Sequence, residues 1–334
     1  MSNVEDEELV NSSPLYKDRA DWKDVSPIYM SDAENAVVRI SHTDSFTDAF
    51  AYFRAILHRN EMSERALELT TICSQLNPAN YSVWYVDLDS LDVRMFRQFR
   101  RNILKALNKN LDAEFKFSSE MISENPKNYQ IWHHRRMLVD WTKDPSRELT
   151  FTASVLVSDP KNYHAWQHRQ FIVEKYNLFT DDEISYSTLL LSGDIRNNSV
   201  WNYRYFIVQN MSNAFTDKSF VSREVEFAKN AISKVSCNES SWSYLNGLLV
   251  NDGLEKHEDV LEFCKVLHKI DTTSTHLRCF LLDYYKEQIE KANESEKNGA
   301  LALSLIDELV QMDPVRRAYY DYVRDHVNNL LSRQ

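Results

Sequence analysis

The chain has 334 residues and a formal net charge of −11, which disfavours the broad phosphate contact on which non-specific nucleic-acid binding depends. With only 4 glycines and 7 prolines, it lacks the turn residues that sandwiches, barrels and glycine-rich phosphate loops need. Because 43% of its residues are hydrophobic, we expect a folded, all-α protein. No apolar stretch approaches the length of a membrane span, so a cytoplasmic location is predicted.

The N-terminal part of the sequence divides into three segments. Residues 1–14 are acidic, lack an apolar core and are predicted to be disordered. Residues 16–25, YKDRADWKDV, are expected to form an arm that packs on the body or on a partner. The segment 46–76 has helical periodicity and is predicted to form the first helix pair. Beyond the acidic stretch we expect one repeat domain, 15–334.

An internal repeat dominates the middle of the chain. The copies share Asn or Asp, then Asn three residues later, then Trp and Arg: NPANYSVW (77–84), NPKNYQIWHHRR (125–136), DPKNYHAWQHRQ (159–170), DIRNNSVWNYRY (194–205) and the decayed CNESSWSYLNGLL (237–249). Their tryptophans are 48, 34, 35 and 41 residues apart, and the two middle spacings are typical of solenoids of antiparallel helix pairs. Within a copy, proline ends one helix and Asn or Asp caps the next. The repeat predicts a crescent-shaped, right-handed α-α superhelix.

The first spacing is too long, and we interpret residues 85–97 as an insertion of 13 residues within the first repeat, either a real loop or a mistaken exon boundary. Removing it restores a spacing of 35. The predicted units then lie near 46–84, 98–132, 133–166, 167–201 and 202–242, followed by capping helices over 255–334 with Pro314 in a first turn.

The repeated Trp and Arg are interpreted as structural. Trp is expected to fill the gap between stacked pairs, and Arg to bind carbonyls or carboxylates of the adjoining unit. No CxxC pair occurs, so four cysteines are interpreted as buried thiols: Cys73, Cys237, Cys264 and Cys279.

Two pairs of histidines lie in the repeat segments. His164 and His168 stand at i and i+4, a spacing that can place two imidazoles on one metal, but no third ligand lies nearby. No metal site is therefore predicted on this chain. His168 is expected to aid packing between repeats, and His133 and His134 to have structural roles.

The copies 125–136 and 159–170, with YKDRADW near the start and DIRNNSVWNYRYF, closely resemble the α subunit shared by protein farnesyltransferase and geranylgeranyltransferase type I. The resemblance extends from about Tyr16 to about residue 325. A tetratricopeptide array has a similar period but a different Trp-Leu-Gly-Tyr and Pro pattern. The resemblance implies a crescent wrapped around a β subunit, with the active site at the interface. It also implies that the β subunit holds zinc, that magnesium accompanies the prenyl diphosphate, and that this chain alone binds no cofactor.

The activity that the resemblance implies is transfer of a farnesyl or geranylgeranyl group from its diphosphate to the cysteine of C-terminal CaaX motifs, in proteins such as small GTPases. The family's diphosphate-binding positions fall on Lys127, which is also the catalytic residue, and on Asn162, Tyr163 and His164. The peptide-binding positions fall on Gln130, Tyr81 and Tyr129.

The chemistry makes these residue types reasonable. Negative charge builds on the leaving diphosphate, and a preplaced ammonium group with phenol and imidazole donors binds that state more tightly than the ground state. Lys127 also directly precedes a predicted helix start, where free N–H groups favour an anion. Without the resemblance, the sequence around Lys127 favours a solvated surface lysine.

Two alternatives remain open at this stage. One is a non-catalytic helical-repeat scaffold that binds peptides or proteins, and the other is a reduced Rab geranylgeranyltransferase α subunit. Farnesyl and geranylgeranyl transfer are not separated, because the β subunits of the two enzymes would set the prenyl length. The insertion at 85–97 is expected to weaken β pairing or to alter the pocket for the X residue.

Overall fold

The computed structural model describes residues 14–29, 42–80, 99–211, 215–250 and 253–333. Within these ranges every regular element is helical, which confirms the all-α prediction. The acidic stretch up to residue 13, the interpreted insertion and Tyr81 lie outside the described residues. The chain divides into two compact units, Met1–Ile172 and Val173–Gln334.

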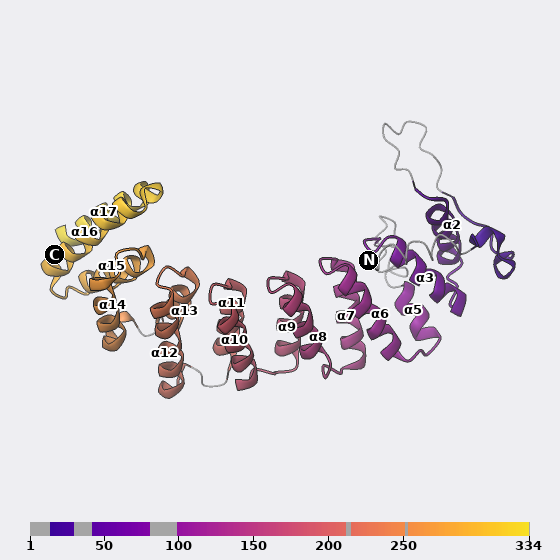
Figure 1. The fold of residues 1–334 in the computed structure, drawn as a ribbon, viewed down its shortest axis with the longest axis horizontal. Helices are drawn as coiled ribbons and strands as arrows, with labels where there is room; N and C mark the ends of the chain where they lie inside the picture. Colours follow the sequence, from indigo (N-terminus) through magenta and orange to yellow (C-terminus); the bar gives the residue numbers. More distant parts are fainter. Residues whose placement is uncertain (1–13, 30–41, 81–98, 212–214, 251–252, 334) are drawn as a thin grey trace. The chain divides into compact units, whose positions relative to one another are not determined.

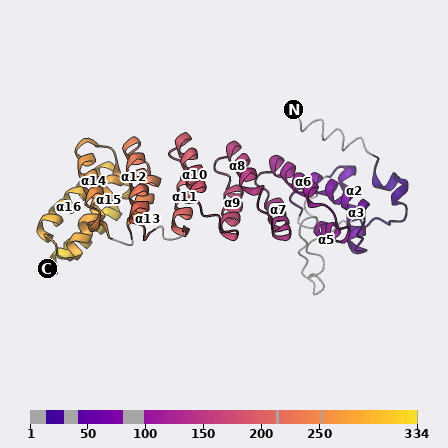
Figure 2. The ribbon, with the colours of Figure 1, turned by 90° about the horizontal axis from the view of Figure 1, so that it is seen from below.

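In its described residues the first unit consists of two short 3-10 turns and a series of α-helices. Figure 1 and Figure 2 show successive helices lying side by side. The elements are η1 (Tyr16–Asp18), η2 (Ala20–Trp22), α2 (Asp44–His58), α3 (Glu64–Leu76), α5 (Phe99–Ala106), α6 (Leu111–Glu124), α7 (Tyr129–Thr142), α8 (Glu148–Ser158) and most of α9 (Tyr163–Lys175). The expected first helix pair is therefore present as α2 and α3.

The second unit continues the pattern. Its elements are the end of α9 and α10 (Asp181–Gly193), α11 (Asn198–Asn210), α12 (Lys218–Lys234), α13 (Glu239–Leu249), η4 (Leu254–Lys256), α14 (Glu258–Ile270), α15 (Thr275–Glu290), α16 (Ser295–Met312), η5 (Pro314–Arg316) and α17 (Arg317–Ser332). The last helices have no repeat tryptophan, and Pro314 opens the short turn between α16 and α17 as predicted. None of the described helices is both long and apolar enough to span a membrane.

Polar side chains at the turns fix where the helices begin. Asn128 accepts hydrogen bonds from the backbone N–H groups of Gln130 and Ile131, and Asn197 accepts one from Ser199. These bonds satisfy donors that the first helical turn leaves without partners. In the four copies that the structure describes at this point, the Asn that precedes the repeat Trp therefore caps a helix, as the sequence predicted.

The N-terminal arm packs on the first helix pair. Trp22 is 1% exposed, and its ring meets the rings of Tyr16 and Tyr52 edge to face at 5.0 and 5.6 Å. Arg65 binds both carboxylate oxygens of Asp24 at 2.7 and 2.8 Å, which ties the arm to α3. The arm therefore packs on the body, one of the two expected outcomes.

Buried glutamates link successive helix pairs. Glu148 is fully buried and accepts hydrogen bonds from Arg135 Nε and Nη2 at 2.8 and 2.9 Å, while His168 Nε2 lies 2.7 Å from the same carboxylate. Burial alone raises the pKa of Glu148, but the bonds from His168 and Arg135 outweigh it and hold the pKa below its ordinary value. The same arrangement occurs in the trios Arg100–Glu114–His134 and Arg204–Glu224–Tyr244.

These trios confirm the structural interpretation of the repeated Arg. Arg135 Nη1 also donates to the hydroxyls of Ser118 and Ser119, so one guanidinium on α7 bonds both α6 and α8. His134 and His168 are buried within the trios, which confirms the structural role predicted for His134 and the packing role predicted for His168.

The cysteines differ from one another in exposure. Cys73 and Cys264 are buried, as expected, whereas Cys237 is exposed and Cys279 is half-buried. The prediction was wrong for Cys237 because that residue directly precedes the cap of α13, at the same place in its repeat that Lys127 holds before α7. That place in the repeat faces outward in both copies.

Candidate functional site

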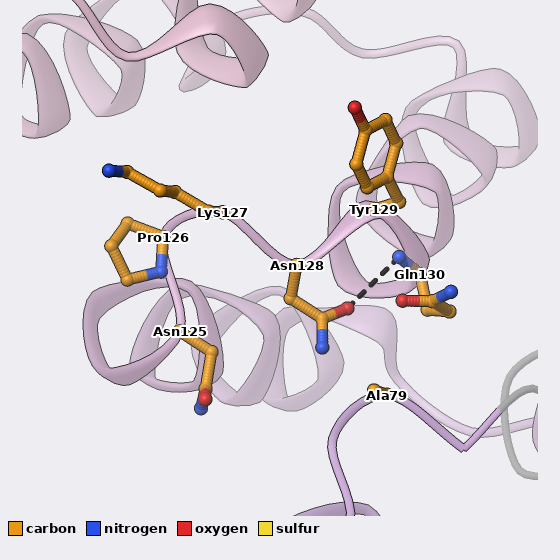
Figure 3. Close-up of a pocket in the computed structure, with 7 residues that line it drawn as sticks. All are labelled: Ala79, Asn125, Pro126, Lys127, Asn128, Tyr129 and Gln130. Atoms are coloured by element: carbon orange, nitrogen blue, oxygen red, sulfur yellow. Dashed lines mark hydrogen bonds between the residues drawn. The ribbon is translucent and has the colours of Figure 1, made fainter.

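The candidate site forms around the tight turn 125–128 between α6 and α7. The backbone N–H of Asn128 donates to the Asn125 carbonyl at 3.1 Å and closes the turn. Figure 3 shows the Lys127 and Tyr129 side chains leaving the backbone on the side opposite to Asn125 and Asn128. Lys127 therefore stands one residue before the cap of α7, as the sequence predicted.

An open pocket of about 500 Å³ lies between this turn and the preceding one. Its lining residues are Ala79, Asn125, Pro126, Lys127, Asn128, Tyr129 and Gln130 (Figure 3). Lys127 is exposed, and no carboxylate of the described chain is paired with its ammonium group. A lysine without an internal counter-ion, next to a helix N-terminus, leaves a positive site for an anion.

His164 lies beside this turn, in the first turn of α9. Its ring contacts Tyr129 edge to face, with centroids 4.2 Å apart, and the Tyr163 ring at 5.5 Å. Both tyrosines are largely exposed, at 66% and 61%, whereas His164 is only 6% exposed. Burial lowers the pKa of His164, and a hydrogen bond to the Lys127 backbone partly opposes that shift. His164 is therefore largely neutral at pH 7 and joins the two exposed phenols to the lysine turn.

Asn162 is placed differently from its neighbours. It is 2% exposed, and its amide nitrogen donates to the Pro126 carbonyl at 3.1 Å. Its amide oxygen accepts from the Ala165 N–H at 2.9 Å and so caps α9. Asn162 lies behind the lysine turn, and both polar atoms of its side chain are bonded within the protein.

The residues that the resemblance places on the peptide side are only partly described. Gln130 is half-buried and lines the pocket, and Tyr129 lies between that pocket and His164. Tyr81 lies outside the described residues. Four further residues line the pocket and were not predicted: Ala79, Asn125, Pro126 and Asn128. The available signal was that each is a repeat proline or lies within two residues of one.

The structure thus brings together an unpaired ammonium group, two exposed phenols and a buried imidazole at adjacent repeat turns of one unit. These groups can hold a polyanion such as a diphosphate through hydrogen bonds and charge. Within the described ranges, no group of three or more His, Cys, Asp or Glu side chains could hold a metal ion.

The fold and the candidate site define a helical-repeat protein with an exposed lysine and a pocket at an interhelical turn, and known proteins share this architecture. The protein prenyltransferase alpha subunit repeat matches residues 111–142, 145–176 and 180–211. These stretches contain the pairs α6 with α7, α8 with α9, and α10 with α11.

Relatives extend the likeness to nearly the whole chain. The Dictyostelium discoideum protein farnesyltransferase/geranylgeranyltransferase type-1 subunit alpha is 34% identical over 95% of both chains. The Solanum lycopersicum protein of the same name is 40% identical, over 36% of this chain and only 31% of its own length. A structure of Candida albicans protein geranylgeranyltransferase-I complexed with GGPP matches with a TM-score of 0.78 and 26% identity, over 93% of this chain and 99% of the other. The chain belongs to the family of protein farnesyltransferase/geranylgeranyltransferase type-1 α subunits.

Proposed function

We propose that this chain is the α subunit of a heterodimeric CaaX prenyltransferase. With a β subunit of farnesyltransferase or geranylgeranyltransferase type I, it helps to transfer a prenyl group from its diphosphate to the cysteine of C-terminal CaaX motifs. Full-length likeness to the Dictyostelium α subunit supports this proposal. So does the likeness to a prenyltransferase structure that is complexed with GGPP. A cytoplasmic location remains a prediction.

The observation that carries the proposal is the exposed, unpaired Lys127 beside Tyr129, Tyr163 and His164. As the bond between the prenyl C1 and the diphosphate oxygen breaks, negative charge grows on the leaving group. A fixed ammonium group with neighbouring donors stabilises that charge more strongly in the transition state than in the ground state. Lys127 would neutralise the leaving diphosphate, and the two phenols would donate hydrogen bonds to it.

Metals and substrates complete the proposal. Zinc on the β subunit would bind the CaaX cysteine and stabilise it as a nucleophilic thiolate, and magnesium would accompany the diphosphate. The described residues of this chain fit a role in binding the anion, because they present cationic and neutral donors at the lysine turn. Gln130, which is half-buried and lines the same pocket, is proposed to contact the CaaX peptide. Tyr81 and Tyr129 are proposed for the peptide side as well.

The direct test is reconstitution. The chain is co-expressed with each β subunit, and the purified pair is supplied with zinc, magnesium and farnesyl or geranylgeranyl diphosphate. We expect a CaaX peptide to gain one prenyl group by mass spectrometry, and a peptide with serine in place of the CaaX cysteine to gain none. A pair that assembles but modifies no CaaX peptide with either diphosphate would favour the scaffold alternative.

A further inference from the structure

The turn that carries Lys127 is held by a side chain of α7 and by one from the turn that precedes α9. The Pro126 carbonyl accepts a hydrogen bond from Trp132 Nε1 of α7 at 2.9 Å and a second from Asn162 Nδ2, at the start of α9, at 3.1 Å. Two side chains therefore hold the backbone directly before Lys127, while the Lys127 side chain itself remains exposed.

Asn162 is poorly placed to bind a substrate anion. Its side chain is almost fully buried, and its amide oxygen is used in capping α9. Its amide nitrogen donates to the Pro126 carbonyl and lies 3.5 Å from Asp159 Oδ2, a second acceptor. A diphosphate that bound Asn162 would have to displace one of these bonds in a buried setting, which is costly.

We call this pair of bonds to one carbonyl, one from a Trp and one from an Asn or Ser, the clasp. The same clasp recurs in the second unit, far from Lys127 in the sequence. Asn238 Nδ2 donates to the Ile195 carbonyl at 2.8 Å, and Trp201 Nε1 donates to the same oxygen at 2.7 Å. In a third copy a serine replaces the asparagine. Ser274 Oγ donates to the Ser236 carbonyl at 2.7 Å and accepts from the Leu277 N–H at 3.2 Å. These bonds therefore recur in three copies of the repeat, and the copies differ in the residue that follows the acceptor carbonyl, which is Lys127, Arg196 or Cys237.

We propose that Asn162 is a positioning residue that acts on Lys127 through the Pro126 carbonyl and does not bind the diphosphate. This inference rests on the proposed function. Losing the Asn162 bond leaves Trp132 as the one side chain of the described residues that holds the Pro126 carbonyl. The turn then moves more, and the ammonium group spends less time where the leaving group needs it. Displacing a catalytic group by about 1 Å can cost up to about 100-fold in rate.

A matched set of variants tests the proposal in the heterodimer. Asn162→Asp keeps the capping oxygen and the side-chain size but removes the donor to Pro126. Asn238→Asp makes the same change in the second unit. Asn162→Ser can both donate and accept, as Ser274 does. We expect Asn162→Asp to lower kcat by about 10- to 100-fold with little change in the KM for prenyl diphosphate, while Asn238→Asp stays within about threefold of the parent enzyme. Asn162→Ser should recover most of the loss.

A double-mutant cycle separates positioning from direct binding. If Asn162 acts through Lys127, Asn162→Asp has little further effect on kcat once Lys127 is alanine. An equal loss in both backgrounds, or a loss that appears mainly in the KM for prenyl diphosphate, would overturn the proposal. Equal losses in Asn162→Asp and Asn238→Asp would overturn it too, because they would indicate a purely structural effect.

Hydrogen exchange on the purified chain decides the structural step without any activity. Asn162→Asp should speed exchange of the amides from Asn128 to Trp132, whereas Asn238→Asp should leave them unchanged. Unchanged exchange in Asn162→Asp would refute the clasp even in an active heterodimer. Faster exchange in a chain whose heterodimer never prenylates a CaaX peptide would support the clasp and refute the proposed function alone.

Discussion

Replacing Glu148 with alanine should destabilise the helices around α7 and α8 by about 3 to 5 kcal/mol, because it leaves a buried cation without its counter-ion. Arg135 is 2% exposed and would lose both of its bonds to the carboxylate, at 2.8 and 2.9 Å. Its remaining acceptors, the Ser118 and Ser119 hydroxyls among them, are neutral. His168 would lose its partner as well.

Urea unfolding of the purified chain, followed by tryptophan fluorescence and far-UV circular dichroism, measures this loss. Glu148→Gln keeps the side-chain volume and separates the lost charge from the cavity. Asp112→Ala is the control, because the Asp112–Arg147 pair is exposed, with side chains 68% and 38% accessible. Such a pair contributes at most about 1 kcal/mol. A Glu148→Ala chain as stable as Asp112→Ala would refute the stabilising role of the buried trio.

Two further predictions follow from the packing. Burial lowers the pKa of His168 below its ordinary 6.5, so its contribution to stability is complete above about pH 6.5 and falls as the pH drops below that value. His168→Tyr, which introduces the residue type that Tyr244 supplies in the third trio, should flatten this dependence in urea titrations between pH 5 and about 7.5, and an unchanged pH profile would contradict it. Gly247→Ala should lower the melting temperature, because an added Cβ would lie 2.7 Å from Tyr205 Cε2, whereas Gly193→Ala, with nothing within 4 Å, should not. Equal melting temperatures for the two glycine variants would contradict this, because they would show that the Tyr205 ring moves aside without loss of stability.

The tryptophan period was enough to predict the helix pairs. Asn, Trp and proline recur because every copy must cap a helix and stack on its neighbour in the same way. Their spacing is therefore visible in a single sequence. The trios were not predicted in detail, because they join residues from three helices. A signal was nevertheless present: the His or Tyr of each trio follows its Glu by 20 residues, as in Glu148 and His168.

The turn that carries the candidate site could be predicted from the sequence, but the contacts of its individual residues could not. Lys127 was placed correctly before a helix start, since the local Asn-Pro pattern fixes that turn. Asn162 and His164 are close neighbours in sequence, yet one is bonded within the fold and the other contacts the exposed tyrosines. Side-chain direction at a helix start depends on the preceding pair, which spacing alone does not reveal.

Stabilisation of the leaving diphosphate by Lys127 is the step on which the proposed activity of this chain depends. The most direct measurement is the single-turnover rate of prenyl transfer to a CaaX peptide by the heterodimer carrying Lys127→Ala. Lys161→Ala, which removes the lysine at the same place in the next repeat, is the control. We predict a rate about 10²- to 10³-fold lower for Lys127→Ala, with assembly and prenyl diphosphate affinity retained. An unchanged rate, or a loss confined to diphosphate binding, would contradict this role of Lys127.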